Sequence, residues 1–160
     1  MDIILKEIVA IIKEETENIN KKIYGTTFLE ILKEKILNRK DQIFSKNLQT
    51  QNSNINLEEK INFTEKNLFF KLSFFQNSET LLKNKLDKNL LIIVFKEFLK
   101  IDILNHNSKK YTNISLKPFM GITLPKGTVC NLNFQKNSLI MELESLDVNF
   151  DIEKQQDGTI

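Results

Sequence analysis

The 160-residue sequence has 41% hydrophobic residues, including twelve phenylalanines, which predicts one packed domain and excludes wholesale disorder. The net charge is +2 and Arg39 is the only arginine among 23 basic residues, so we expect no nucleic-acid binding. One cysteine excludes an internal disulfide. Asp2 and Lys6 interrupt the apolar N-terminus, which therefore resembles neither a signal peptide nor a membrane span. We expect a soluble, cytoplasmic protein without membrane association.

Residues 1–46 predict a helical hairpin. Gly25 is expected to end the first helix, and Thr27 with Glu30 forms a capping-box pattern for the second. The hairpin either packs on the rest of the domain or forms a dimerisation arm. Apolar residues recur at steps of three and four, as on one helical face: Ile4, Ile8, Ile11, Ile12, Ile19 and Ile23, then Phe28, Leu29, Leu32, Ile36, Ile43 and Phe44.

Residues 47–56 are polar and without period, which predicts a linker, and residues 57–155 are expected to form a β domain with a tail at 156–160. Leu90–Phe95 is apolar throughout, which indicates a central strand buried on both faces. Short strands with frequent turns are typical of a sandwich or barrel. The predicted strands are Lys60–Thr64, Leu68–Gln76, Leu90–Phe95, Phe98–Leu104, Tyr111–Leu116, Gly121–Leu124, Val129–Phe134, Leu139–Leu143 and a last one near Val148–Ile152.

The stretch Leu116–Phe134 contains both prolines, two of the four glycines and the cysteine. Apolar residues flank Pro125–Thr128 on both sides, which predicts a strand, a tight turn and a second strand. We expect these two strands to form a β-hairpin around which the β domain is organised.

The run Leu90–Phe134, extending less clearly to Leu146, resembles the cupins, whose fold is a double-stranded β-helix or small jelly roll. Ile92–Ile101 is similar to the first cupin motif in length and apolar pattern. Leu116-Lys117-Pro118 is followed at the family spacing by Pro125-Lys126-Gly127. The resemblance implies a mainly β protein with an N-terminal helical segment and a cupin-like jelly-roll barrel.

The residues that hold the metal in cupins are missing here. In the resemblance, Cys130 stands at the last histidine, Leu90 at the glutamate, and Lys83 and Lys85 near the paired histidines. The motif glycine falls on Glu97, and the usual glycine-aspartate pair falls on Phe119-Met120. One thiol cannot supply the several ligands that a transition metal needs. We therefore expect no metal and no cofactor.

Four residues are candidates for a ligand pocket: Cys130, Phe119, Met120 and Glu142. Cys130 is at the family histidine position, although a barrel cysteine is most often a small buried residue. Phe119 and Met120 occupy a turn that usually carries glycine, which favours their exposure.

Two further acids, Glu144 and Asp102, and the only histidine are weaker candidates. Glu142 and Glu144 share one strand face, which is either solvent-facing or directed to the barrel mouth, and Asp102 has the same ambiguity. His106, the only histidine, is expected in an exposed turn.

These observations favour a non-catalytic, metal-free cupin-like protein that binds a small molecule in the barrel or has a structural or regulatory role. By analogy with the family we expect a homodimer. The alternative is an enzyme, because Ile114–Glu144 is also similar to cupin sugar-nucleotide isomerases and epimerases of surface-polysaccharide synthesis, although those use histidine bases. A third possibility is a helical interaction module on a barrel platform.

Overall fold

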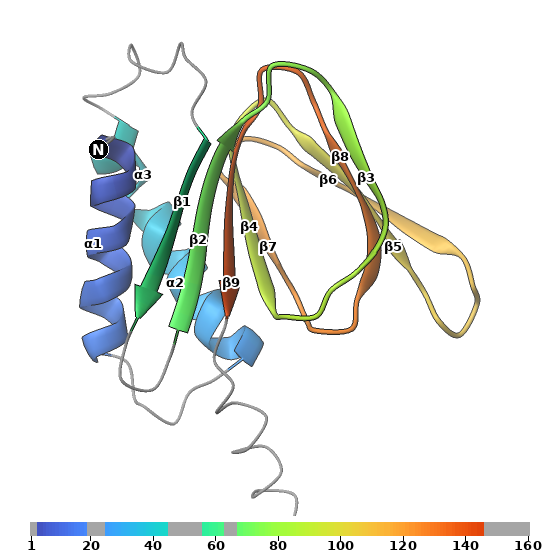
Figure 1. Cartoon of the computed structure of the whole chain (residues 1–160), viewed down its shortest axis with the longest axis horizontal. Helices are drawn as coiled ribbons and strands as arrows, with labels where there is room; N and C mark the ends of the chain where they lie inside the picture. The colour runs from blue at the N-terminus through green and yellow to red at the C-terminus, as the bar shows by residue number, and fades with distance from the viewer. Residues whose placement is uncertain (1–2, 19–24, 45–55, 63–66, 146–160) are drawn as a thin grey trace, which may run out of the picture.

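The computed structural model describes residues 3–18, 25–44, 56–62 and 67–145. Three helices come first and nine strands follow in the described residues (Figure 1). The helices are α1 (Ile3–Asn18), α2 (Gly25–Asn38) and α3 (Lys40–Phe44). The strands are β1 (Asn56–Asn62), β2 (Asn67–Phe74), β3 (Glu79–Lys85), β4 (Leu90–Lys96), β5 (Leu99–Leu104), β6 (Tyr111–Leu116), β7 (Met120–Leu124), β8 (Val129–Phe134) and β9 (Leu139–Ser145).

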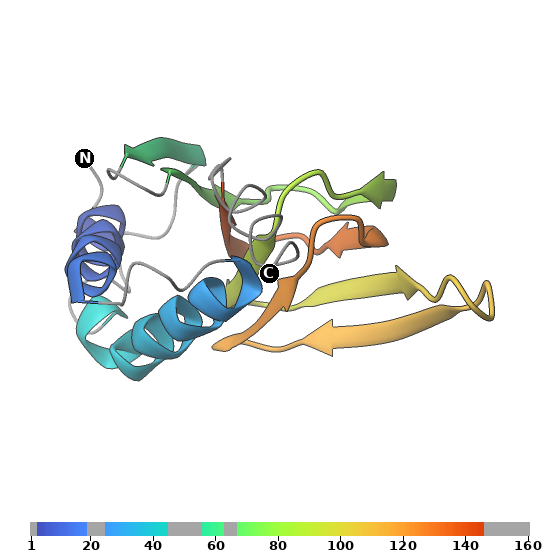
Figure 2. The same cartoon turned by 90° about the horizontal axis from the view of Figure 1, so that it is seen from below.

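The strands form two antiparallel sheets, here called sheets A and B. Sheet A has the order β1-β2-β9-β4-β7, and sheet B has the order β3-β8-β5-β6. Successive strands pass repeatedly from one sheet to the other, as in a jelly roll. The helices cover one face of sheet A, and sheet B lies on its other side (Figures 1 and 2). The predicted fold, mainly β with an N-terminal helical segment and a cupin-like jelly roll, is confirmed.

Strand β4 of sheet A is buried on both faces. Leu91, Ile93 and Phe95 belong to the core shared with the helices. The alternate residues Leu90, Ile92 and Val94 belong to the core shared with sheet B. Because side chains alternate across a strand, a strand between two layers must be apolar at every position. The prediction that Leu90–Phe95 is a central buried strand is confirmed.

Helix α2 packs closely on the edge strand β7. A Cβ atom on Gly121 would lie 3.0 Å from the carbonyl oxygen of Ile92 and 3.1 Å from Cδ of Lys33, so only glycine leaves room for the helix. The Thr123 hydroxyl donates to Oε2 of Glu30 at 2.8 Å, and Oε1 of Glu30 pairs with Lys33 at 2.8 Å. The buried apolar helix residues that the structure describes, from Ile8 to Ile43, lie in one core with residues of sheet A.

Several sequence predictions about the helices need correction. Gly25 begins α2, where it was expected to end the preceding helix, and α2 starts before the predicted cap at Thr27. Glu30 bonds to Lys33 and Thr123. The second helix is divided by a turn at Arg39, whose amide donates to the Ile36 carbonyl.

Two predictions about the strands are wrong. Strand β3 was missed because Glu79–Lys85 is rich in Glu, Lys and Asn, which are poor strand formers. The expected hairpin across Pro125–Thr128 has the predicted turn, with Thr128 N donating to the Pro125 carbonyl, but β7 belongs to sheet A and β8 to sheet B. Gly127 N donates to Leu86, so the turn crosses between the sheets. The last predicted strand and most of the linker lie outside the described residues.

Four non-glycine residues among those described adopt the left-handed conformation, Glu97, Lys109, Phe119 and Asn137, and two of them are at cupin motif positions. Glu97, between β4 and β5, has φ 64°, and Phe119, between β6 and β7, has φ 63°. This region favours glycine, and it is a true outlier for a bulky residue. These are two positions at which the family resemblance placed a glycine. The backbone therefore keeps the conformation of the motif although the residue has changed.

Candidate functional site

Three charged residues lie on the inner face of sheet A, which faces sheet B. Lys71 of β2 is directly opposite Glu142 of β9, and Glu144 follows two residues later on the same face. The neighbouring Met141 and Leu143 belong to the helix-side core, so the glutamates point the other way, to the side of Ile140. We call Lys71, Glu142 and Glu144 the polar inner wall. The ambiguity in the sequence is resolved in favour of the barrel side.

Burial changes the electrostatics of the polar inner wall. Burial raises the pKa of Glu142 above its ordinary value, while the Lys71 ammonium lowers it and the Glu144 carboxylate raises it further. The pKa of Glu144 is also raised, first by burial and then by Asp87, with Lys71 and Lys88 acting in the opposite direction. Desolvation is the main cause in both cases, so both carboxyls are held where their charge is costly.

The barrel is more open along the strands β2 and β3 than in its centre. Lys71, Glu142 and Glu144 are partly buried, whereas Ile92, which pairs with Glu142 on β4, is wholly buried. On sheet B, Leu81 pairs with the buried Leu132, yet it is 48% exposed. Solvent therefore reaches the inner side of the barrel near the polar inner wall. At β4, the next strand of the sheet, apolar packing around Ile92 excludes solvent.

Ser73 adds an uncharged polar group to this face. It pairs with Ile140 and is only 2% exposed. Its Oγ has no hydrogen-bond partner within the described part of the chain. A buried hydroxyl without a partner costs free energy. Neither Ser73 nor Lys71 was singled out from the sequence, although a lysine and a serine at alternate positions of a phenylalanine-rich strand are a signal for a polar patch facing inward.

Cys130 lies on the inner face of sheet B and is fully buried. It pairs with Ile103 on β5 and Asn84 on β3. Burial raises the pKa of its thiol. A nucleophilic cysteine needs the opposite shift and an approachable sulfur. Cys130 therefore behaves as a packing residue of the barrel core.

Phe119 and Met120 are placed on different sides of sheet A. Phe119 packs against the helix-side core: its ring centre is 6.4 Å from that of Phe95, and Nζ of Lys40 lies 5.1 Å from it. Met120 pairs with Val94, which belongs to the barrel-side core, and is 45% exposed. The four residues predicted as a pocket are thus not gathered: Phe119 is separated by the sheet from Glu142 and Cys130.

The remaining candidate residues lie away from the barrel interior. Asp102 is on the outer face of sheet B, where its Oδ2 accepts a hydrogen bond from Asn133 Nδ2 at 3.3 Å. His106 is exposed in the turn between β5 and β6, as predicted. Among the residues that the structure describes, no three His, Cys, Asp or Glu side chains gather closely enough to hold a metal ion. None of the described helices has the length and apolar character needed to cross a membrane.

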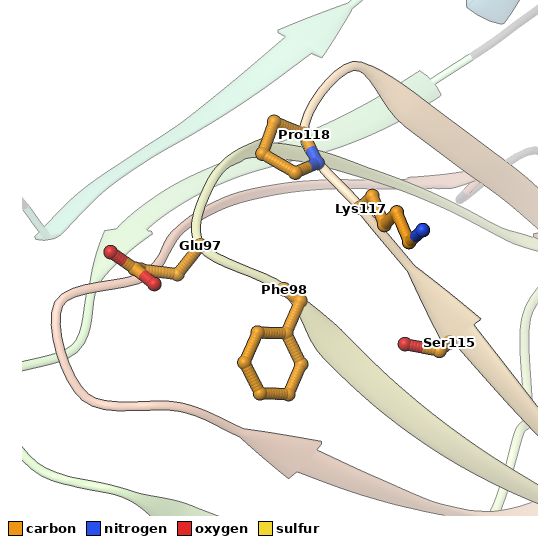
Figure 3. Close-up of a pocket in the computed structure, with 5 residues that line it drawn as sticks. All are labelled: Glu97, Phe98, Ser115, Lys117 and Pro118. Atoms are coloured by element: carbon orange, nitrogen blue, oxygen red, sulfur yellow. The ribbon is translucent and has the colours of Figure 1, made fainter.

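A cavity of 470 Å³ lies outside the barrel, at the turns that follow β4 and β6 (Figure 3). Glu97, Phe98, Ser115, Lys117 and Pro118 line it. No pattern in the sequence predicted this cavity, because its residues come from two turns that only the pairing of β5 with β6 brings together.

The sequence matches no family model and no curated protein. Similar solved structures include a cupin superfamily protein from Desulfitobacterium hafniense, with 12% identity, a TM-score of 0.44 and coverage of 57% of this chain and 78% of that one. KdgF from Halomonas sp. has 13% identity and a TM-score of 0.44, over 55% of this chain and 76% of its own. The cupin domain of Drosophila melanogaster CENP-C has 9% identity and a TM-score of 0.46, over 66% and 97%.

The fold is cupin-like. Its two facing antiparallel sheets and its turns at Glu97, Phe119 and Gly127 define this fold. The resemblance to sugar-nucleotide isomerases and epimerases stays a prediction.

Proposed function

We propose that this protein is a non-catalytic, metal-free binding protein that takes a small molecule at the polar inner wall of its barrel. The observation that supports this most is the direct pairing of Lys71 with Glu142, beside Glu144, on a face that it shares with the apolar core of the barrel. Buried charge pairs often stabilise a fold less than apolar residues of the same volume would. Stabilisation of the fold therefore does not explain these charges, whereas binding of a charged ligand does.

The charges on the polar inner wall define the class of ligand. Glu142 and Glu144 carry two negative charges against the single positive charge of Lys71, so the wall favours a monocation. Phe69, which pairs with Glu144 and is partly exposed, and the half-exposed Leu81 supply apolar surface on this side of the barrel. We therefore propose a small primary amine with an apolar body, whose ammonium group lies between the two carboxylates.

The competing enzyme function lacks its base in the barrel. Proton abstraction next to a sugar carbonyl needs a positioned base, which the isomerase resemblance would supply as histidine. His106 is exposed in the β5–β6 turn, and Cys130 is a buried thiol with a raised pKa. Binding without catalysis is the better account of these residues. With a single cysteine in the sequence, we also propose a reducing, cytoplasmic location.

We further propose a homodimer that forms through β3. This strand is an edge of sheet B, and it presents Leu81 at 48% and Leu82 at 68% exposure. Two adjacent leucines on an open edge favour contact with a second copy. Light scattering should give a dimeric mass for the wild type and a monomeric mass for Leu82→Lys, with Met120→Lys as an exposed control. A monomeric wild type would refute the dimer.

A ligand screen followed by thermal unfolding tests the binding function. The panel contains n-butylamine, phenethylamine, small carboxylates and nucleotide sugars. We expect the amines to raise Tm, since a site filled at 100 times its Kd adds about 2.7 kcal/mol. The matched variants Glu142→Gln and Asp102→Asn separate the barrel from the outer surface, and only the first should abolish the shift. Stabilisation by nucleotide sugars alone would support the isomerase-like alternative.

A further inference from the structure

The cavity outside the barrel has the chemistry of a second binding site. It lies on the outer face of sheet B, on the opposite side of that sheet from the barrel core. Lys100 and Ser115 are cross-strand partners on this face, because the alternate pairs Leu99–Leu116 and Ile101–Ile114 point into the barrel. The cavity is therefore independent of the polar inner wall.

Phe98 supplies an aromatic surface at this cavity. Its side chain is partly buried, and its ring lies between Glu97 on one side and Ser115 on the other (Figure 3). Nζ of Lys100 lies 5.7 Å from the ring centre and helps to hold the ring in place. Pro118 adds a second apolar surface on the rim. An aromatic ring with such a rim offers stacking to a flat, partly apolar ligand.

The polar groups around the ring include both hydrogen-bond donors and hydrogen-bond acceptors. The Glu97 carboxylate accepts only, the Lys117 ammonium donates only, and the Ser115 hydroxyl does both. With Lys100 over the ring, two ammonium groups and one carboxylate surround it, so donors and an acceptor are both within reach of a ligand. A neutral molecule with many hydroxyl groups and one apolar face can bond to both kinds of group.

We propose that this cavity binds a neutral sugar ring, with the C–H face of the sugar on Phe98 and its hydroxyls bonded to Glu97, Ser115 and Lys117. The cavity volume of 470 Å³ is in the range of small-molecule sites, which span about 300–1,000 Å³. Glu97 takes its left-handed conformation directly before Phe98, and both residues line the cavity.

The neighbouring surface continues the same chemistry. On the outer face of sheet B, Thr80 donates to Asn133 Oδ1 at 3.1 Å, and Asn133 donates to Asp102 at 3.3 Å. These bonds fix amide and carboxylate groups in a row across β3, β8 and β5. A short saccharide chain that begins at Phe98 can extend along this row. We therefore expect an oligosaccharide to bind more tightly than a monosaccharide.

Saturation-transfer NMR on the full-length protein, with cellobiose and maltose as probes and methyl glucoside as the single ring, tests the proposal. We expect transfer to the C–H groups of the sugar. Phe98→Leu keeps an apolar side chain of similar kind and should weaken binding about tenfold, and Ser115→Ala should weaken it less. Tyr111→Leu removes an exposed aromatic from the far end of the same strand pair and is the matched control.

Five outcomes decide the result. Loss in Phe98→Leu together with full binding in Tyr111→Leu supports the site. Equal loss in both variants, or no transfer to any of the three sugars, overturns it. Binding of glucose 6-phosphate without binding of the neutral sugars also overturns it, because the ligand would then be an anion. A signal that disappears in Glu142→Gln would assign the sugar to the barrel, so this test is separate from that of the amine site.

Discussion

Lys71 and Glu142 occupy directly opposite positions in the antiparallel pairing of β2 with β9, on the side of sheet A that faces sheet B. The ammonium lowers the pKa of the carboxyl, but burial acts more strongly and raises it. The carboxylate therefore remains an energetic cost to the empty protein. This relationship links the stability of the barrel to the ligand that we propose for it.

Glu142→Gln is expected to stabilise the empty protein at pH 7 by about 1 kcal/mol, because it removes a buried charge while Lys71 keeps the Glu144 carboxylate as a partner. The pKa of Glu142 in the folded state is raised above its ordinary value of 4.5, so the cost of its charge is fully present above the folded pKa. The cost fades as the pH falls through the folded pKa toward 4.5. The difference in the free energy of unfolding between Glu142→Gln and the wild type should therefore decrease over the same pH interval. Urea unfolding from pH 7 to pH 4 measures it.

Lys71→Met provides the opposite control, because it leaves the Glu142 carboxylate without its cation. We expect it to lower the free energy of unfolding at pH 7 and to have a smaller effect near pH 4. A stabilising Lys71→Met, or a destabilising Glu142→Gln at pH 7, would contradict the stated balance between burial and the lysine.

Ser73→Ala should raise the free energy of unfolding by about 1 kcal/mol, because it removes a buried hydroxyl whose oxygen has no hydrogen-bond partner among the described residues. Thermal unfolding at neutral pH measures the effect. The exposed Ser108→Ala serves as a comparison for the loss of a hydroxyl alone. A loss of stability in Ser73→Ala would show that this hydroxyl makes a bond that stabilises the fold.

Glycine at the left-handed residues Glu97 and Phe119 should have opposite effects. Glu97 is exposed, so Glu97→Gly relieves a backbone conformation that costs about 1–2 kcal/mol and should leave the protein equally or more stable. Phe119→Gly relieves the same conformation but loses the contacts with Phe95 and Lys40, and it should destabilise by about 1–3 kcal/mol. Chemical denaturation compares the two. Stabilisation by Phe119→Gly would mean that this ring does not anchor the helices.

Cys130 should react slowly with iodoacetamide in the folded protein and rapidly after denaturation. Its sulfur is fully buried and burial raises the pKa of the thiol, so little thiolate is accessible at pH 7. Mass spectrometry of the labelled protein over time measures both rates. Fast labelling of the native protein would reopen a catalytic role for Cys130.

Local patterns predicted most strands, because side-chain alternation and turn residues depend only on neighbouring positions in the sequence. The same patterns failed where the answer depends on distant pairing. The chain at Pro125–Thr128 has the expected turn, yet β7 pairs with β4 and β8 pairs with β3 and β5. Strand β3 was missed because its edge position permits polar residues that a central strand excludes.

Only part of the candidate site could be predicted from the sequence, for a related reason. Glu142 and Glu144 were recognised as a pair, but Ile140 and Met141 show that both faces of β9 are buried, so alternation alone did not reveal which face the acids take. The helices bury the face of β9 that carries Met141 and Leu143, so Glu142 and Glu144 lie on the other face. Lys71 became significant only through its pairing with Glu142, which joins residues far apart in the chain.

The amine-binding site is tested most directly by thermal unfolding of the wild type and Glu142→Gln with n-butylamine and phenethylamine at pH 7. The account predicts that at least one amine raises the Tm of the wild type in a concentration-dependent manner and leaves the Tm of Glu142→Gln unchanged. An equal shift in both proteins, or no shift in the wild type at any amine concentration, would contradict it.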